Sequence, residues 1–326
     1  MNLNDLTSEA LAGLVEILKN HPNYRVLTHQ TPQDHYFVAA AESVIRKGII
    51  LDTETTGKER TDKIIELGMI LFEYDAVTGQ AYRVLERFDE LEDPGMSIPP
   101  EATKVNGITD EMVKGKRIND DEVNRIAMDV DIIIAHNSGF DRGYAEERWP
   151  IFKSKPWACS LKQVDYASEN IGSAKLDYLA YLLGFFYDAH RAINDCEALL
   201  KILQTPLPGT GKLGLKYILD VYQKADINLG AIGSPFATKD TLKARRVKMA
   251  DGSERKYNWK DVQPKGFWHI DLPEDLIEAE TTWLQSQIYA GKAFQVSLGK
   301  VDSFNRFSQR DAEREIRYFD TSKPQV

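Results

Sequence analysis

The order of its apolar segments most restricts how this chain can fold. Short runs of branched aliphatic residues, bounded by glycines or turn-forming residues, are typical of buried strands. We expect such strands at Ile49–Leu51, Lys63–Tyr74, Ala81–Phe88 and Asp131–Ala135. The turn Asp75–Gln80 joins the second and third of these strands, so the pattern predicts a hairpin.

Helical segments follow the hairpin and alternate with the last strand. Their apolar residues recur at helical spacing, and the segments are long enough for two or more turns. A hairpin followed by strands that alternate with helices predicts an α/β fold, with a mixed sheet flanked by helices. The expected helices span Asp120–Met128, Gly143–Trp149, Leu161–Asn170, Lys175–Leu183 and Ile193–Leu203.

A helical extension is expected to precede this domain, over residues 1–46. Ser8 stands before apolar residues at helical spacing, so it is the expected cap of a first helix. A second helical stretch is expected over Phe37–Ile45. The α/β domain itself would then span residues 47–204.

The composition changes near Gln204. The stretch QTPLPGTGKLG is rich in proline and glycine, which indicates a linker over residues 205–237. The remaining residues, 238–326, predict a small α+β module. Its clearest element is a helix over Pro273–Tyr289, which has acidic residues in the first turn, where they favour a helix.

Charge and cysteine content exclude several classes of protein. The formal net charge of −9 argues against a generic basic coat for nucleic acid. The two cysteines, Cys159 and Cys196, cannot build a disulfide framework or a cysteine-rich zinc site, and they fit a reducing, cytoplasmic setting. The N-terminal sequence lacks the pattern of a signal peptide, and no stretch has the ~18 apolar residues of a membrane helix.

Two acids stand at the end of the first buried strand. In a strand, residues two apart point to the same face, so Asp52 and Glu54 would project together. Two carboxylates this close repel each other and resist burial. Either the strand ends in solvent, with both acids hydrated, or a cation lies between them.

Three further residues could complete such a site. Asp141 follows the strand Asp131–Ala135, and His190 and Asp195 stand before and within an apolar helix. Taken singly, each has a structural explanation as a helix cap or as a charge on a first turn. Taken together, the acids offer the oxygen ligands that Mg²⁺ and Mn²⁺ prefer, and histidine is a general base suited to neutral pH. Two ions bound by such acids can catalyse phosphodiester hydrolysis.

Three segments carry a family resemblance: DTETTG, HNSGFD and HRAIND. They resemble the three exonuclease motifs of the DnaQ-like family, in its DEDDh branch, and the resemblance covers roughly residues 47–204. It implies an RNase H-like fold. It also implies 3′→5′ hydrolysis at the 3′ ends of single strands, with two metal ions and release of nucleoside 5′-monophosphates.

The resemblance assigns catalytic roles to five residues. It identifies four of them as ligands of two Mg²⁺ or Mn²⁺ ions and the histidine as the general base. These residues are Asp52, Glu54, Asp141, Asp195 and His190.

The resemblance also implies contacts with the substrate. Thr55 and Thr56 follow the second acid, where the family holds the 3′ end. Leu67 and Met69 lie on the next strand, near the position where relatives wedge the terminal base, and Asn137 shapes the second motif.

One position departs from the family pattern. The stretch EATKVNGITDEMV resembles a family loop that commonly carries a histidine before GIT, but this chain has Asn106 there. An amide can donate a hydrogen bond to a nucleotide but cannot carry charge. Binding of the strand end, or the choice of substrate, is therefore expected to differ.

The start of the C-terminal module is basic. Residues 238–265 have an excess of about five positive charges, with aromatic residues interleaved. Cations that contact phosphates and aromatics that stack on bases hold single strands, so Arg245 and Arg246 are candidate substrate contacts. Alternatively, the aromatics form the core of the module and the cations only solvate it.

Three functions fit these observations. The first is a free-standing exonuclease that acts on DNA, which is the expected substrate. The second is an RNA trimmer similar to RNase T or oligoribonuclease. The third is a proofreading subunit bound to a polymerase or sliding clamp, for which the pentapeptides 204–208 and 295–299 faintly resemble clamp-binding motifs. The sequence does not indicate the oligomeric state.

Overall fold

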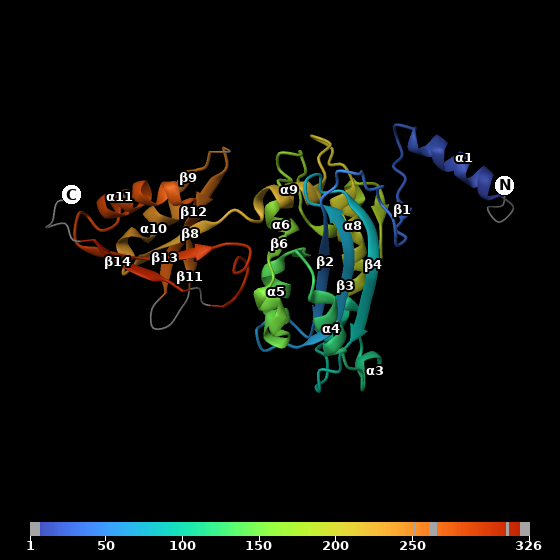
Figure 1. Cartoon of the computed structure of the whole chain (residues 1–326), viewed down its shortest axis with the longest axis horizontal. Helices are drawn as coiled ribbons and strands as arrows, with labels where there is room; N and C mark the ends of the chain where they lie inside the picture. Colours follow the sequence, from blue (N-terminus) through green and yellow to red (C-terminus); the bar gives the residue numbers. More distant parts are fainter. Residues whose placement is uncertain (1–6, 251, 261–265, 311–312, 320–326) are drawn as a thin grey trace. The chain divides into compact units, whose positions relative to one another are not determined.

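The computed structural model describes residues 7–250, 252–260, 266–310 and 313–319. The chain divides into two compact units, Met1–Tyr222 and Gln223–Val326 (Figure 1).

The first unit is built on a five-stranded mixed sheet with the strand order β4-β3-β2-β5-β6. The long strands β2, β3 and β4 are antiparallel, whereas β5 and β6 run parallel to β2. The α/β mixed-sheet fold expected from the sequence is thereby confirmed. The strands are β2 (Ile45–Thr55), β3 (Ile64–Asp75), β4 (Ala81–Leu91), β5 (Ile132–Ala135) and β6 (Trp157–Cys159).

Helices of this unit cover the sheet and its ends. Several are short, and the expected helix over 161–170 is reduced to a single turn, α6. The helices are α1 (Ser8–Lys19), α2 (Pro100–Asn106), α3 (Asp110–Val113), α4 (Asp120–Ala127), α5 (Ser138–Arg148), α6 (Ser160–Gln163), α7 (Leu176–Leu182), α8 (Ala192–Gln204) and α9 (Gly214–Val221), with a 3₁₀ turn at Pro150–Ser154.

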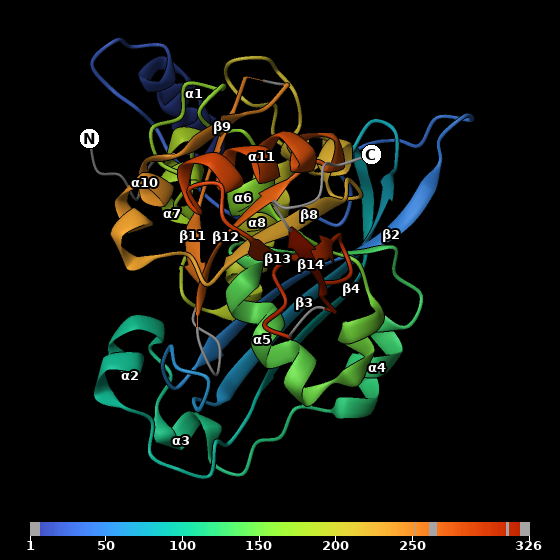
Figure 2. The same ribbon diagram turned by 90° about the vertical axis from the view of Figure 1, so that its left-hand side faces the viewer.

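The two faces of the sheet carry separate cores. Because side chains alternate along a strand, Ile50 and Ile70 pack toward Leu199 of α8, whereas Ile49 and Leu51 pack on the other face. Helices α4 and α5 cover that second face, as Figure 2 shows. The sequence signal of consecutive aliphatic residues thus reflects a strand that is buried on both sides.

Helix α8 begins unusually close to the sheet, at Gly68 of β3. A Cβ atom at this glycine would lie 2.5 Å from the carbonyl carbon of Ala192, the first residue of α8. The Cys196 thiol also lies 3.4 Å from the Gly68 carbonyl oxygen, to which it donates a hydrogen bond. The missing side chain at Gly68 therefore lets the first turn of α8 lie against the sheet.

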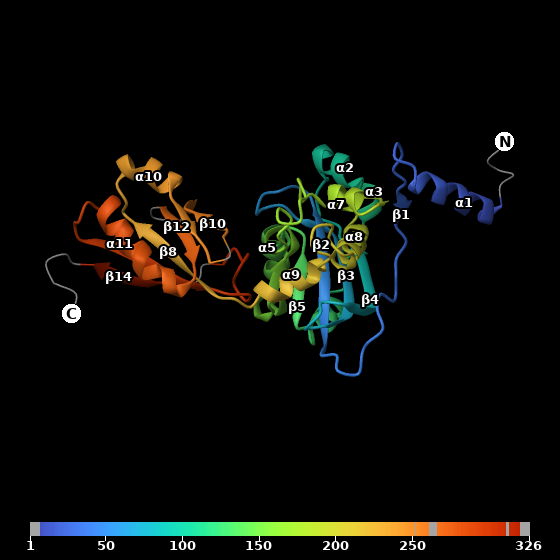
Figure 3. The ribbon, with the colours of Figure 1, turned by 90° about the horizontal axis from the view of Figure 1, so that it is seen from above.

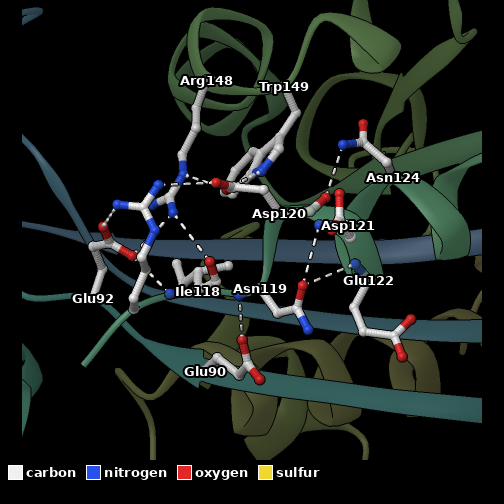
Figure 4. Close-up of polar contacts among 11 residues, drawn as sticks. Glu90, Glu92, Ile118, Asn119, Asp120, Asp121, Glu122, Asn124, Arg148 and Trp149 are labelled. Atoms are coloured by element: carbon white, nitrogen blue, oxygen red, sulfur yellow. Dashed lines mark hydrogen bonds and ion pairs between the residues drawn. The ribbon is translucent and has the colours of Figure 1, made fainter.

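A polar network fastens α4 and α5 to the end of β4 (Figure 4). Asn119 caps α4 by accepting hydrogen bonds from the backbone N–H groups of Asp121 and Glu122. Asp120 accepts from the Arg148 guanidinium at 3.0 Å and from the Trp149 indole at 2.8 Å. Because α5 is held near its C-terminus in this way, its N-terminal turn has a defined position at the end of β5.

The N-terminal segment differs from the expected helical extension. Helix α1 is present, but Thr7 rather than Ser8 supplies the capping oxygen. No helix forms over residues 37–45, and strand β2 begins at the last of these residues, Ile45. Instead, backbone hydrogen bonds join residues 34–37 to β4, and β1 (Thr28–His29) pairs with β7 (Phe185–Phe186). The segment lines the edge of β4, which would otherwise present unpaired backbone groups.

The range expected to be a linker, 205–237, also has regular structure. Helix α9 places Leu215 and Ile218 in the core beneath α8, and both side chains are fully buried. Further along, β8 (Asp226–Ile232) is the central strand of the second unit. The unit boundary lies between Tyr222 and Gln223, within this range.

The second unit contains an antiparallel sheet with the order β11-β12-β8-β13-β14. Helices α10 (Lys239–Ala244) and α11 (Ile277–Gln287) pack on one of its faces (Figure 3). A small hairpin, β9–β10, adds to that core. Its remaining strands are β9 (Arg246–Lys248), β10 (Glu254–Lys256), β11 (Asn258–Lys260), β12 (Phe267–Leu272), β13 (Phe294–Val301) and β14 (Glu315–Phe319).

Candidate active site

The C-terminal end of β2 presents Asp52 and Glu54 toward helix α8. In the antiparallel register Asp52 pairs with Gly68, and Glu54 pairs with Glu66. Paired residues point to the same face of a sheet, so Glu66 joins this set. All three carboxylates lie on the face where Ile50 packs against α8, just past the end of that apolar core.

Asp141 approaches the cluster from helix α5. Its carboxylate accepts two hydrogen bonds from Thr53, from the backbone N–H at 3.0 Å and from the hydroxyl at 2.8 Å. Thr53 lies between the two acids of β2 and points to the face covered by α5. This pair of hydrogen bonds positions Asp141, which is 2% exposed, beside the strand end.

Asp195 lies on the first turn of α8 and organises the loop that carries His190. One of its oxygens accepts from the Tyr187 hydroxyl at 2.8 Å, and the other accepts from the His190 backbone N–H at 2.9 Å. His190 itself has a φ of 64°, in the left-handed region that non-glycine residues rarely adopt. The loop therefore holds the histidine in a defined but unfavourable backbone conformation.

These elements bring together a possible metal site. One ligand atom each from Glu54, His190 and Asp195 lies within 4.8 Å of the others. The charge of Asp141 helps to raise the pKa values of both Asp52 and Glu54, so these three acids lie close together. The five residues identified in the sequence thus converge from β2, α5 and the start of α8.

The acids resist ionisation in the absence of a cation. Burial, reinforced by the charges of the neighbouring acids, raises the pKa of Asp52 well above its usual range and raises that of Glu54 to about 8. Burial raises the pKa of Asp141 to about 7, against the hydrogen bonds from Thr53, and it also raises the pKa of Asp195. Each shift disfavours the charged form.

This donor set fits a hard divalent ion. Carboxylate oxygens are the ligands that Mg²⁺ and Mn²⁺ prefer, and a bound cation would remove the mutual repulsion of the acids. Arg191 lies beside this cluster, close enough for the charge of Glu54 to act on its guanidinium. It is already engaged in an ion pair with Glu66, at 2.5 Å.

The threonines after Glu54 shape their own turn. The Thr55 hydroxyl donates to the Gly57 carbonyl, and the Thr56 hydroxyl donates to Asp62 at 3.1 Å while accepting from the Lys63 N–H at 2.9 Å. Both side chains are buried. Both hydroxyls are thus engaged in hydrogen bonds within the turn, and their expected contact with a 3′ end stays a prediction.

Leu67 and Met69 lie on the wrong face of β3 for the expected wedge. Both are fully buried in the core beneath α4 and α5, whereas the acids of β2 face α8. The sequence places them on the correct strand, but their odd-numbered positions alternate with Glu66 and Gly68. A shift of one residue reverses the face of a side chain.

Asn106 does lie beside the acid cluster. Its side-chain oxygen accepts from the Ile108 N–H at 3.0 Å, and a hydrogen bond from its side chain lowers the pKa of Glu54 against the effect of burial. Asn137 precedes α5 with a φ of 77° and makes no side-chain cap. Its contribution is to the backbone turn between β5 and α5.

The candidate contacts in the second unit differ from one another. Arg245 donates to Glu280 at 2.8 Å and lies over the Trp283 ring, so it stabilises the module. Arg246 is exposed, and its guanidinium bonds to backbone carbonyls of the same turn. Within the basic range 238–265, residues 251 and 261–265 lie outside the described residues.

The two pentapeptides that resemble clamp motifs are parts of folded elements. Gln204 is buried and bonds to the backbone of Ala81 and Gly79, and Leu207 is 1% exposed. Residues 295–299 form the interior of β13, between β8 and β14. Neither segment is presented as a free peptide.

Three residues of the site were not singled out from the sequence: Thr53, Glu66 and Tyr187. Glu66 could have been noticed, because it is a charged residue inside the apolar run KIIELGMILF. Thr53 and Tyr187 carry no comparable signal, since their roles depend on contacts with Asp141 and Asp195 that the fold creates.

A family comparison agrees with this geometry. Residues 49–203 match the model of the RNase T family, described as exonuclease. This range includes all five residues of the acid and histidine cluster.

Individual relatives were also found. The chain is 28% identical over 164 residues to the DNA polymerase III subunit epsilon of Treponema pallidum. The aligned region covers 47% of this chain and 73% of that protein. It is also 28% identical over 176 residues to the PolC-type DNA polymerase III of Clostridium perfringens, covering 50% of this chain but only 11% of that protein. Among solved structures, exonuclease X in complex with 5′ overhanging duplex DNA matches with a TM-score of 0.35 and 25% identity, over 47% of this chain and 88% of that one.

None of the helices in the described part of the chain combines the length and the apolar character needed to cross a bilayer.

Proposed function

Because residues 49–203 carry an RNase T/DnaQ-like exonuclease domain, we propose that this protein is a metal-dependent 3′→5′ exonuclease of the DEDDh type. Its substrate is the 3′ end of a single strand, with DNA as the preferred polymer, and its products are nucleoside 5′-monophosphates. The relatives named as DNA polymerase III proteins support the choice of DNA.

One observation carries the proposal. Four acids converge from three elements, and burial and mutual repulsion raise their pKa values. Acids that only stabilised the fold would be compensated by basic side chains, or by enough hydrogen-bond donors to lower their pKa values, as Glu169 is. An arrangement of oxygen donors that needs cations for balance is suited to hold two Mg²⁺ or Mn²⁺ ions, which activate a water and stabilise the leaving oxygen of a phosphodiester.

The protein groups have separate tasks in this reaction. Asp52, Glu54, Asp141 and Asp195 hold the ions. His190 is exposed at the mouth of the cluster and takes the proton of the attacking water. The hydrogen bonds from Thr53 to Asp141 and from Tyr187 to Asp195 keep two of the carboxylates in place.

The test is a digestion of matched single-stranded DNA and RNA, each labelled at the 5′ end to reveal the ladder of shortened products. With Mg²⁺ or Mn²⁺ we expect stepwise shortening of DNA from the 3′ end, faster than that of RNA. A chelator and the variant Asp52→Asn should each stop it. Faster digestion of RNA would favour the trimming alternative, and no metal-dependent shortening of either polymer would refute the proposal.

A further inference from the structure

Glu66 is a buried acid that lies beside the cluster but has no role in the proposed reaction. It is fully buried on β3 and lies opposite Glu54 in the sheet register. One of its oxygens accepts from the Ala192 backbone N–H at 2.9 Å. The other accepts from the Arg191 guanidinium at 2.9 and 2.5 Å.

These three hydrogen bonds hold the two residues that directly follow His190. On the other side of the histidine, Asp195 accepts hydrogen bonds from Tyr187 and from the His190 N–H itself. The loop is therefore fastened both before and after His190. A backbone at φ 64° persists only where the surrounding structure determines it, because that conformation is unfavourable for a residue with a side chain.

The sheet makes this fastening rigid relative to the metal ligands. Because Glu54 and Glu66 are cross-strand partners, the same pair of strands presents one acid to the ions and the other to the histidine loop. Gly68 allows the first turn of α8 to come within reach of Glu66. Strand, loop and helix thus meet at one carboxylate.

We propose that Glu66 and Arg191 form a positioning clamp that sets His190 at its working distance from Glu54 and Asp195. Neither residue is catalytic, since each acts through the histidine. The inference rests on the proposed role of His190 as the general base.

Two substitutions that change the charge of the site in opposite directions test the positioning clamp. Glu66→Gln makes the site less negative, and Arg191→Met makes it more negative. If these residues acted only through the electric field at the ions, the two variants would change kcat in opposite directions. Misplacement of the base lowers kcat in both, by about 10- to 100-fold, with KM changed much less.

The matched control is Glu169→Gln in the same unit. Glu169 is also buried, and it accepts from the backbone N–H groups of Gly209 and Thr210 and from two hydroxyls, in a loop that carries none of the proposed catalytic residues. We expect this variant to lower the melting temperature without lowering kcat. An equal loss of kcat in Glu169→Gln and Glu66→Gln would overturn the clamp, because general destabilisation would then explain both.

Combination with His190→Ala decides whether the clamp works through the histidine. In that background Glu66→Gln and Arg191→Met should cause no further loss of kcat, whereas equal losses in both backgrounds would overturn the inference. If Glu66→Gln does not fold, Arg191→Met decides alone, since its side chain is partly exposed. Full activity of His190→Ala by itself would instead refute the proposed base.

Discussion

Two groups of buried acids, one in each unit, are compensated in opposite ways. In the second unit, Glu280 accepts from the Arg245 guanidinium at 2.8 Å and from the Tyr257 hydroxyl at 3.1 Å. Asp226 lies 3.0 Å from both Arg255 and Arg306. In the first unit, four acids face one another at the ends of strands and helices, and their pKa values are raised.

The contrast separates buried charge that the protein itself compensates from buried charge that it leaves uncompensated. A buried charge is tolerated when a partner and hydrogen bonds compensate for its lost hydration. Glu280 and Asp226 meet this condition, because arginines of the second unit are their partners. The acid cluster does not, so a cation from solution is the partner that would complete it. Glu66 stands between the two cases, because it lies beside the cluster but has its own arginine.

The largest expected effect comes from removing one acid of the cluster. Asp52→Asn should abolish metal-dependent hydrolysis, because it removes a central ligand. The same change should leave the metal-free fold at least as stable, because it removes repulsion. Activity with Mg²⁺ and thermal melting with a chelator measure the two effects. Substantial residual turnover would contradict the assignment of the ligand.

The second effect concerns the base. His190→Ala should lower turnover on the order of 10²–10⁴-fold while changing substrate affinity little. Single-turnover rates and binding to a 3′-blocked single strand separate the two quantities. A loss of affinity as large as the loss of rate would point to a structural role for the loop.

Removal of a paired acid in the second unit should act on stability instead. Glu280→Ala should lower the free energy of unfolding by roughly 1–3 kcal/mol, because the Arg245 side chain and the Tyr257 hydroxyl lose their shared partner. Hydrolysis of a very short oligonucleotide should be unchanged. Glu278→Ala, at an exposed position on the same helix, is the control for denaturant unfolding. Equal losses in the two variants would argue against the pairing.

The pH dependence of stability should also separate the units. Groups with a raised pKa in the folded state bind more protons than the unfolded chain does, so the stability they provide is lost as pH rises. With the pKa of Glu54 at about 8 and that of Asp141 at about 7, metal-free protein should lose stability steadily as the pH rises from 5 to 8. Melting with and without Mn²⁺ tests this, because the ion should restore stability mainly at the higher pH. A metal-free stability that is flat over this range would contradict the shifts.

The smallest effect is expected at Arg246. If this exposed residue contacts the phosphates of a long strand, Arg246→Glu should weaken binding of that strand. The slope of the logarithm of the binding constant against the logarithm of the salt concentration should then decrease in magnitude by about 1. Arg317→Glu, at an arginine that is paired with Glu315 on β14, is the control. Parallel salt slopes for the wild type and Arg246→Glu would show that Arg246 does not touch nucleic acid.

Patterns local in sequence were sufficient for much of the site. Alternation and apolar runs predicted the strands of the mixed sheet, and the spacing of acids at element ends predicted Asp52, Glu54, Asp141, His190 and Asp195. The strand predictions are confirmed, because strand periodicity depends on near neighbours, whereas the roles of the five site residues stay predictions.

Patterns of composition were less reliable where packing overrode them. The proline- and glycine-rich stretch after Gln204 contains α9 and β8, since Leu215 and Ile218 gain more from burial than the turn residues cost. Arg245 looked like a phosphate contact because its partner, Glu280, is 35 residues away. Leu67 and Met69 lie on the expected strand but on the other face.

The sequence by itself determined which residues could bind metal and which runs of the chain form strands. The tertiary structure alone decided which face of β3 meets the acids, that Glu66 reaches the residues after His190, and that the acids of the second unit are paired. The physical reason is the distance along the chain over which each interaction acts. Periodicity is set by the local backbone, whereas register, pairing and burial arise only when distant segments share one core.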